Sequence, residues 1–321
     1  MTNKYLNPAG GGWFIIMAAV LWGTTGTAQA LTPPGTQSMT VGTMRLLLGA
    51  ITLSIIAAYR KELGSLRKWR SWPLVPTMLA AAGVALYQIF FFAAVKRTGV
   101  AVGTIVGIGS TPVAAGILVY LRHREAPGRV WMLSTALAIL GCALLILTGS
   151  SIEIDVVGIF LAFAAGTSYA LYTMMSKELL DKHPAGAVVT LTFWIGVFIL
   201  LPILLVGDLS WLLVPRGLVV AVYLGVVTVG VAYFLFMVGL STVSVANAAT
   251  LTLAEPVTAA ILGIAILSEQ LSWVAIIGIA LILCGLVLLT LDGQKMGKAG
   301  QKKVVRALKP GLMIYPNSDD K

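Results

Sequence analysis

The chain has 321 residues, of which 58% are hydrophobic and only 11% charged, and its mean hydropathy is +0.95. Soluble globular domains carry about 25% charged residues, so this composition excludes an ordinary soluble domain and favours a protein embedded in a lipid bilayer. The net charge of +10 comes from short loops and the C-terminal tail rather than from one amphipathic face, which argues against nucleic acid as a partner.

Ten apolar runs are long enough to cross the hydrocarbon core of a bilayer, which takes about 20 residues of α-helix. In chain order they cover residues 13–31, 39–59, 72–95, 100–121, 130–148, 156–175, 188–206, 218–240, 245–267 and 273–291. Turn-forming sequences separate neighbouring runs, among them Pro33-Pro34-Gly35 and Pro127-Gly128. The sequence therefore predicts an all-α membrane protein with ten transmembrane helices.

The basic residues orient these helices, because Lys and Arg in short loops favour the cytoplasmic side. With the N-terminus inside, 18 of the 22 Lys and Arg residues fall on the inner side and three on the outer side, and Arg45 lies within a helix. Both termini are therefore predicted to be cytoplasmic. Trp72, Trp131, Trp211 and Trp273 lie near expected helix ends, which is typical of interfacial anchors.

The chain contains an internal repeat, since paired Pro, Glu and Gly residues recur at an offset of 144 positions. The pairs are Pro112 with Pro256, Glu125 with Glu269 and Gly141 with Gly285, and an offset of 143 pairs Gly23 with Gly166. Residues 1–150 and 151–291 form the two predicted repeats, and residues 292–321 form a basic tail that we expect to be disordered. Each repeat holds five helices, so the second enters the membrane in the inverted orientation.

Inverted repeats of this kind are typical of secondary transporters, in which the substrate binds near the midplane and access alternates between the two sides. The sequence has no GxxxxGK[ST] phosphate loop, so ATP is not expected to drive transport. Cys142 and Cys284 lie inside apolar runs, and we expect His123 and His183 to be solvated in loops. We therefore expect no metal, no cofactor and no catalytic residue.

Polar and aromatic side chains on several expected helices are candidates for lining a central cavity. The candidate substrate-binding residues are Trp22, Thr25, Tyr87, Gln88, Ser168, Tyr169, Tyr172, Tyr233 and Asn247. Aromatic rings with a few amides and hydroxyls suit an amphipathic solute that has an apolar side chain. Helix packing is the alternative role of each residue taken singly.

Two charges lie inside expected membrane spans, where an ionised side chain costs about 2.5 to 3.5 kcal/mol on insertion scales. In a functional role, Glu255 contacts a substrate amine or carries a proton. In a structural role, it is a packing group beside Pro256. Arg45 either extends to the membrane interface or binds a substrate carboxylate. Pro112 and Pro256 are expected to kink their helices.

Several motifs resemble those of the EamA-type branch of the drug/metabolite transporter superfamily, over roughly residues 13 to 291. They are Leu253-Ala254-Glu255-Pro256-Val257, Leu267-Ser268-Glu269-Gln270-Leu271, Ser110-Thr111-Pro112-Val113, Trp22-Gly23 and Met44-Arg45-Leu46-Leu47. The first repeat has Thr111 before its proline where the second has Glu255, so Glu255 has no symmetric partner.

The resemblance implies a multi-pass protein of the bacterial inner (plasma) membrane that exports small metabolites. Among family members, the chain most resembles exporters of aromatic and other neutral amino acids of the YddG type. We therefore expect a secondary transporter with a small-molecule substrate, for which a monomer suffices. The alternatives are an exporter of another metabolite or drug class and an intramembrane enzyme, and Glu255 is compatible with both proton-coupled and downhill flux.

Overall fold

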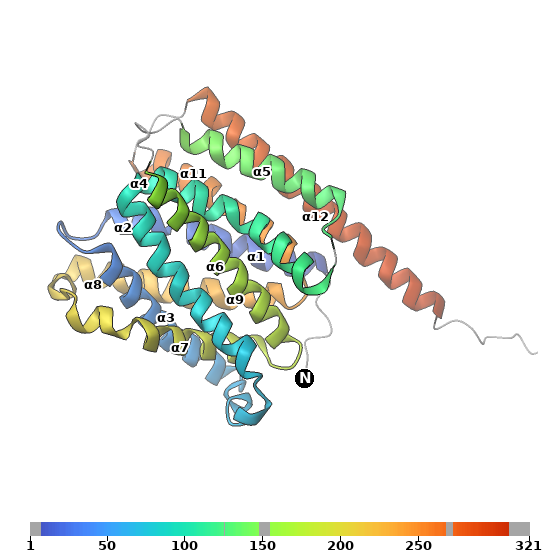
Figure 1. Cartoon of the computed structure of the whole chain (residues 1–321), viewed down its shortest axis with the longest axis horizontal. Helices are drawn as coiled ribbons and strands as arrows, with labels where there is room; N and C mark the ends of the chain where they lie inside the picture. The colour runs from blue at the N-terminus through green and yellow to red at the C-terminus, as the bar shows by residue number, and fades with distance from the viewer. Residues whose placement is uncertain (1–7, 125, 148–154, 268–271, 308–321) are drawn as a thin grey trace, which may run out of the picture.

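The computed structural model describes residues 8–124, 126–147, 155–267 and 272–307, and all regular elements within these ranges are helical. The α-helices are α1 (Pro8–Gly23), α2 (Thr25–Ala30), α3 (Ser38–Tyr59), α4 (Leu74–His123), α5 (Arg129–Leu147), α6 (Val156–Leu180), α7 (Ala185–Val206), α8 (Pro215–Tyr223), α9 (Ala232–Leu240), α10 (Val245–Leu251), α11 (Glu255–Leu267) and α12 (Trp273–Ala307). They form one bundle, from which the end of α12 projects (Figure 1).

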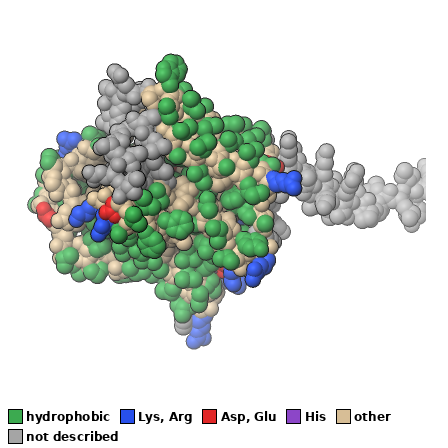
Figure 2. Space-filling model, turned by 45° about the horizontal axis from the view of Figure 1, so that its top comes forward, with side chains coloured by type: hydrophobic (Ala, Val, Ile, Leu, Met, Phe, Trp, Pro, Cys, Tyr) green, Lys and Arg blue, Asp and Glu red, His purple; other side chains and the backbone are tan. Residues whose placement is uncertain are grey.

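Eight segments of the described chain are long and apolar enough to cross a membrane, which confirms the predicted membrane character. They are Gly10–Ala30, Ser38–Tyr59, Leu74–Thr98, Val156–Leu180, Ala185–Val206, Pro215–Leu240, Val245–Leu262 and Trp273–Asp292. The other two predicted spans, 100–121 and 130–148, correspond to the second part of α4 and to α5. Hydrophobic side chains cover much of the molecular face in Figure 2, with Lys and Arg near its margins.

α4 is assigned as a single helix of 50 residues from its backbone hydrogen bonds. In space, however, it consists of two arms that run in different directions (Figure 1). In a straight helix, residues eight apart are separated by about 12 Å. A Cβ atom placed on Gly103 would instead lie 3.2 Å from the Cα atom of Val95. The chain therefore turns back on itself between these two residues, at the boundary that the hydropathy pattern predicts.

Three predicted spans are interrupted rather than continuous. The first breaks at Thr24, whose hydroxyl donates to the carbonyl of Leu21 (2.7 Å), and this break separates α1 from α2. The span 245–267 contains a 3₁₀ turn, Thr252–Ala254, immediately before α11, because Pro256 has no N–H to donate to a carbonyl four residues earlier. The span 218–240 contains a π-helix, Leu224–Val231, and π segments often mark functional sites.

The first helix of each sequence repeat packs against the other repeat. α1 runs antiparallel to α9 and also contacts α11, where Gly23 lies against the carbonyl of Glu255. α6 lies along both arms of α4, where Gly166 lies against the carbonyl of Gly107. A side chain at either of these two glycines would collide with the partner helix, so glycine allows the close approach.

α5 and α12 form an antiparallel pair beside the rest of the bundle (Figure 1). Gly141 of α5 lies against Ile282 of α12, and Gly285 of α12 lies against Ala138 of α5. The start of α12 is therefore close to the end of α5. The residues 125 and 268–271, which include Glu125 and Glu269 of the repeat, lie outside the described residues.

Contacts between loops show which of them share an end of the bundle. At the α6–α7 end, the guanidinium of Arg122 pairs with the carboxylate of Glu178 (3.0 Å). At the same end, the carboxylate of Glu62 accepts a hydrogen bond from the backbone N–H of Gly186 (2.7 Å), in the first turn of α7. We use the term α6–α7 end for residues 60–72, 122–124, 126–129 and 177–186.

The opposite end of the bundle, which we call the α2–α3 end, comprises residues 31–38, 96–98, 155 and 207–216. Arg97 pairs there with Asp155 (3.2 Å), and Arg216 donates to the backbone carbonyl of Leu31 (2.7 Å). Successive loops therefore alternate between the two ends, as membrane-crossing helices require.

The prediction that His183 is solvated is wrong, because only 6% of the residue is exposed. Its ring stacks on Trp72 with 3.7 Å between centroids, and its Nδ1 atom lies 2.9 Å from the hydroxyl of Ser65. Burial lowers the pKa of His183, which favours the neutral ring. His183 therefore fastens the α3–α4 connection to the α6–α7 loop.

Candidate functional site

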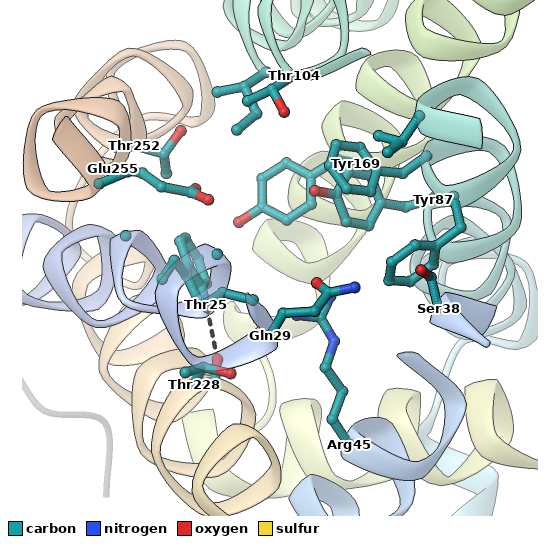
Figure 3. A pocket seen from close by; sticks show the side chains of 18 of the residues that line it. Thr25, Gln29, Ser38, Arg45, Tyr87, Thr104, Tyr169, Thr228, Thr252 and Glu255 are labelled. Carbon is teal, nitrogen blue, oxygen red and sulfur yellow. Dashed lines mark hydrogen bonds between the residues drawn. The ribbon is translucent and has the colours of Figure 1, made fainter. Parts of the chain in front are cut away.

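A cavity of about 490 Å³ lies inside the bundle, where the broken helices meet (Figure 3). It is lined by Trp22, Gly23, Thr25, Gly26, Gln29, Ala30, Thr32, Ser38, Arg45, Tyr87, Phe91, Phe92, Val95, Thr104, Ile108, Thr111, Tyr169, Thr228, Tyr233, Thr252, Glu255 and Ala259. The lining reaches Thr32 and Ser38 at the α2–α3 end. No described residue of the α6–α7 end lines the cavity, so its described lining extends toward the α2–α3 end.

Trp22 connects the first repeat to the π-helix of the second. Its indole N–H donates to the backbone carbonyl of Thr228 (2.8 Å). Its ring lies 4.8 Å from that of Tyr233 and 6.2 Å from that of Tyr169, measured between centroids. These contacts satisfy the buried indole donor and leave a ring facing the cavity, where it is available to an apolar group.

An aromatic cluster closes the cavity on the side of the α6–α7 end. Tyr172 follows Tyr169 by one turn of α6 and is fully buried, with its ring 6.2 Å from that of Phe193 and 6.1 Å from that of Tyr233. Phe193 and Tyr233 lie 4.7 Å apart. Tyr172 and Phe193 do not line the cavity, so these packed rings lie between its lining and the α6–α7 end.

Arg45 points from α3 into the cavity (Figure 3). Its Nη2 atom donates to the side-chain oxygen of Gln88 (3.0 Å), and the amide nitrogen of Gln88 donates to the carbonyl of Gly42 (3.1 Å). The Cζ atom lies 5.9 Å from the ring centroid of Phe92. The Nε–H is buried without a hydrogen-bond partner among the described residues, so the guanidinium retains donors for a ligand.

Glu255 faces the same cavity from a different wall (Figure 3). It is the first residue of α11 and follows the 3₁₀ turn that contains Thr252. Within the described part of the chain its carboxylate makes no ion pair or hydrogen bond, and it does not contact Arg45. The cavity therefore presents one cationic and one anionic group that do not neutralise each other by contact.

The structure brings together five of the nine predicted substrate-binding residues, namely Trp22, Thr25, Tyr87, Tyr169 and Tyr233. The other four do not line the cavity. Gln88 accepts a hydrogen bond from Arg45, and Tyr172 belongs to the aromatic cluster described above. The Ser168 hydroxyl donates to the carbonyl of Ala164 (2.8 Å), and Asn247 lies in the first turn of α10.

Several cavity residues escaped the sequence prediction, notably Thr104, Thr111, Thr228 and Thr252. Thr104 and Thr228 are lone hydroxyls in apolar runs, whereas Thr111 follows Ser110 and Thr252 lies close to Thr250. Threonine hydroxyls in helices usually donate to their own backbone, as Thr228 does to the carbonyl of Leu224 (2.7 Å), so the sequence pattern alone does not separate cavity threonines from packed ones.

The two predicted kink residues differ in structure. Pro112 lies inside α4, where helical hydrogen bonding continues on both sides. Pro256 is the second residue of α11 and follows the change from 3₁₀ to α geometry.

No group of three or more His, Cys, Asp or Glu side chains in the described residues is placed to hold a metal ion. The cavity offers one guanidinium, one carboxylate, the amide of Gln29, hydroxyls and aromatic rings.

Comparison with known proteins gives concordant matches. The EamA-like transporter family matches residues 9–147 and 156–291. An uncharacterized transporter of Bacillus subtilis, YwfM, is 42% identical over 286 residues, which cover 89% of this chain and 95% of YwfM. The threonine/homoserine exporter RhtA of Escherichia coli is 26% identical over 294 residues, covering 88% and 92%. A solved crystal structure has a TM-score of 0.77 at 19% identity, covering 89% of this chain and 98% of its own.

Proposed function

Because this chain belongs to the EamA-like transporter family, we propose that it is a secondary transporter that exports aromatic and other neutral amino acids without ATP. The observation that carries this proposal is the cavity in which Arg45 and Glu255 face a common space without contacting each other. An α-amino acid carries a carboxylate and an ammonium on adjacent carbons. It is therefore a small solute that offers a partner to both charges.

Each part of such a substrate has a partner in the cavity. The guanidinium of Arg45, held by Gln88, suits a carboxylate, since Arg binds planar anions with two parallel hydrogen bonds. The carboxylate of Glu255 suits the ammonium. The rings of Trp22, Tyr87 and Tyr169 surround the remaining space and suit an apolar or aromatic side chain.

Alternating access between two inverted repeats is part of the proposal. The antiparallel pair α5 and α12 supports the inversion, and so do the equivalent contacts of Gly23 and Gly166, which the repeat superposes. In the ten-helix arrangement that we propose, with both termini in the cytoplasm of a bacterial cell, the cavity opens to the outside. Tyr172 and Asn247, on the closed side, would then contact substrate in the inward-open state.

The likeness to RhtA supports the amino-acid class, because RhtA is named for the export of threonine and homoserine. The cavity hydroxyls of Thr25, Thr104 and Thr252 favour a second candidate within this class, namely small hydroxyl-bearing amino acids. Both candidates use Arg45 and Glu255 in the same way and differ only in the side chain of the substrate.

The test is counterflow in proteoliposomes that contain the purified protein and no nucleotide. Radiolabelled phenylalanine, tryptophan and threonine are each offered outside vesicles loaded with the same unlabelled amino acid. We expect saturable accumulation of at least one label, and its identity decides between the aromatic and the hydroxyl-bearing substrates. If no amino acid exchanges while a non-zwitterionic metabolite does, the proposed substrate class is wrong.

A further inference from the structure

A second hollow lies on the outside of the bundle, between the second arm of α4 and α5, and shares no residue with the central cavity. Its volume is about 460 Å³, and it is lined by Val113, Gly116, Ile117, Tyr120, Ala126, Pro127, Trp131, Met132, Thr135, Ala136 and Ile139. We call it the α4–α5 groove. It exists because α5 packs mainly along α12, through Gly141 and Gly285, and therefore stands off from α4.

The groove is apolar over nearly its whole lining. The hydroxyl of Thr135 is already paired, since it lies 2.8 Å from that of Thr250. Val113, Ile117 and Met132 are 41%, 51% and 52% exposed, so the groove is open on its outer side. An apolar hollow of this kind does not retain ordered water. Its natural occupant is a flexible hydrocarbon chain.

One end of the groove adjoins the connection between α4 and α5, of which Ala126 and Pro127 form part of the lining. Three exposed arginines flank this connection: Arg122 in the last turn of α4, Arg124 directly after α4, and Arg129 at the first position of α5. Arg122 is paired with Glu178, whereas Arg124 and Arg129 make no ion pair with any described residue. Two cations therefore lie beside the end of an apolar groove.

We propose that the α4–α5 groove binds an anionic phospholipid, with one acyl chain between the two helices and the headgroup phosphate on Arg124 and Arg129. The combination fits because phosphate recruits Arg, and basic loops at a membrane surface select anionic lipids. The ring of Trp131, which lies against Gly116, forms the wall of the groove next to the loop. The site does not depend on the proposed substrate of the central cavity.

Native mass spectrometry of the full chain in mild detergent tests the site. The protein is mixed with equimolar phosphatidylglycerol and phosphatidylcholine of identical acyl chains. We expect phosphatidylglycerol adducts to predominate. Replacing both Arg124→Gln and Arg129→Gln should lower that preference by about fivefold per arginine removed. Arg67→Gln with Lys68→Gln removes two exposed charges from another loop of the same end and should change nothing.

A second pair of variants tests the groove itself. Ala136→Phe fills it, and we expect this variant to lose adducts of both lipids. Leu133→Phe adds an exposed aromatic ring to the same helix outside the groove and should bind as the unmodified protein does. Glycerol 1-phosphate, which has the headgroup but no chains, should not raise the melting temperature.

Three results would overturn the proposal. They are equal binding of the two lipids by the unmodified protein, retention of adducts by Ala136→Phe, and stabilisation by glycerol 1-phosphate alone. The first would indicate a neutral lipid in the groove, the second a lipid elsewhere on the protein, and the third a free-phosphate site.

Discussion

At the residue scale, Arg45 and Glu255 place opposite charges in one cavity from α3 and α11. Burying a charge in a membrane is costly unless a partner compensates it. The side chain of Gln88 compensates Arg45 in part, whereas Glu255 has no contact of this kind among the described residues. A bound zwitterion would supply the missing partner to each.

Replacing Arg45→Gln removes the proposed carboxylate contact. A hydrogen bond to a charged group contributes about 1.5 to 3 kcal/mol, so we expect the concentration for half-maximal counterflow to rise about tenfold to 100-fold. Phenylalaninamide, which has no carboxylate, should inhibit the variant and the unmodified protein equally. An unchanged half-maximal concentration for phenylalanine would contradict the role of Arg45, and Arg67→Gln is the charge control.

Replacing Glu255→Gln tests the other charge with the complementary ligand. We expect the variant to bind phenylalanine less tightly, while N-acetylphenylalanine, which has no ammonium, inhibits as before.

The same vesicles show whether Glu255 carries a proton during transport. If flux in the unmodified protein responds to an imposed pH gradient and flux in the variant does not, the carboxylate couples transport to protons, and an unaltered response excludes this.

His183 gives the α6–α7 end a defined dependence on pH. Burial lowers the pKa of His183, so below pH about 6.5 the unfolded chain binds a proton that the folded chain does not. We expect the melting temperature to be level above that pH and to fall as the pH decreases. His183→Gln should lose much of this slope, whereas His123→Gln, at an exposed position, should keep it. Equal slopes in all three proteins would contradict the assignment.

At the element scale, the interruptions of the helices position the cavity side chains. Glu255 is the first residue of α11, and the 3₁₀ turn before it changes the direction of its side chain relative to α10. Thr24, the π-helix and this turn interrupt three different spans around one cavity. Interrupted helices leave backbone groups and adjacent side chains available to a solute at membrane depth.

Replacing Pro256→Ala should make the span from α10 to α11 more regular. Because alanine restores the backbone N–H that Pro256 lacks and favours helix more strongly than proline does, we expect an equal or higher melting temperature together with reduced transport. Pro202→Ala, at an exposed proline inside α7, is the matched control and should leave transport unchanged. Full activity of Pro256→Ala would show that the interruption is not needed for the transport cycle.

Hydropathy predicted the helical runs well, because a bilayer demands continuous apolar helices of one length. It missed the breaks at Thr24 and in the π-helix, since these depend on contacts between distant segments, such as Trp22 with Thr228. Arg45 and Glu255 were found because a charge in an apolar run is conspicuous. Helix periodicity predicts which residues share a helix face, as Ser168 does with Tyr169 and Tyr172, but it does not reveal how far a cavity extends along that face.

At the scale of the whole molecule, the two ends of the bundle have different compositions and contacts. We expect residues 67 and 178 to face the cytoplasm, and residues 97 and 216 to face outward. Single cysteines introduced at these positions, in a background where Cys142 and Cys284 are replaced by Ser, should differ in their accessibility from outside the cell. An impermeant maleimide should label positions 97 and 216 in intact cells, and positions 67 and 178 only after permeabilisation. Labelling of all four from one side would refute the predicted topology.

The packing of α1 has a consequence for biosynthesis. Trp22 finds its hydrogen-bond partner 206 residues later in the chain, and Gly23 lies against α11. At a translation rate of about 5 to 20 residues per second, α1 waits on the order of ten seconds or more in the membrane before its docking surface has been synthesised. A ribosome stalled after the first repeat would therefore leave α1 exposed to lipid and to membrane proteases.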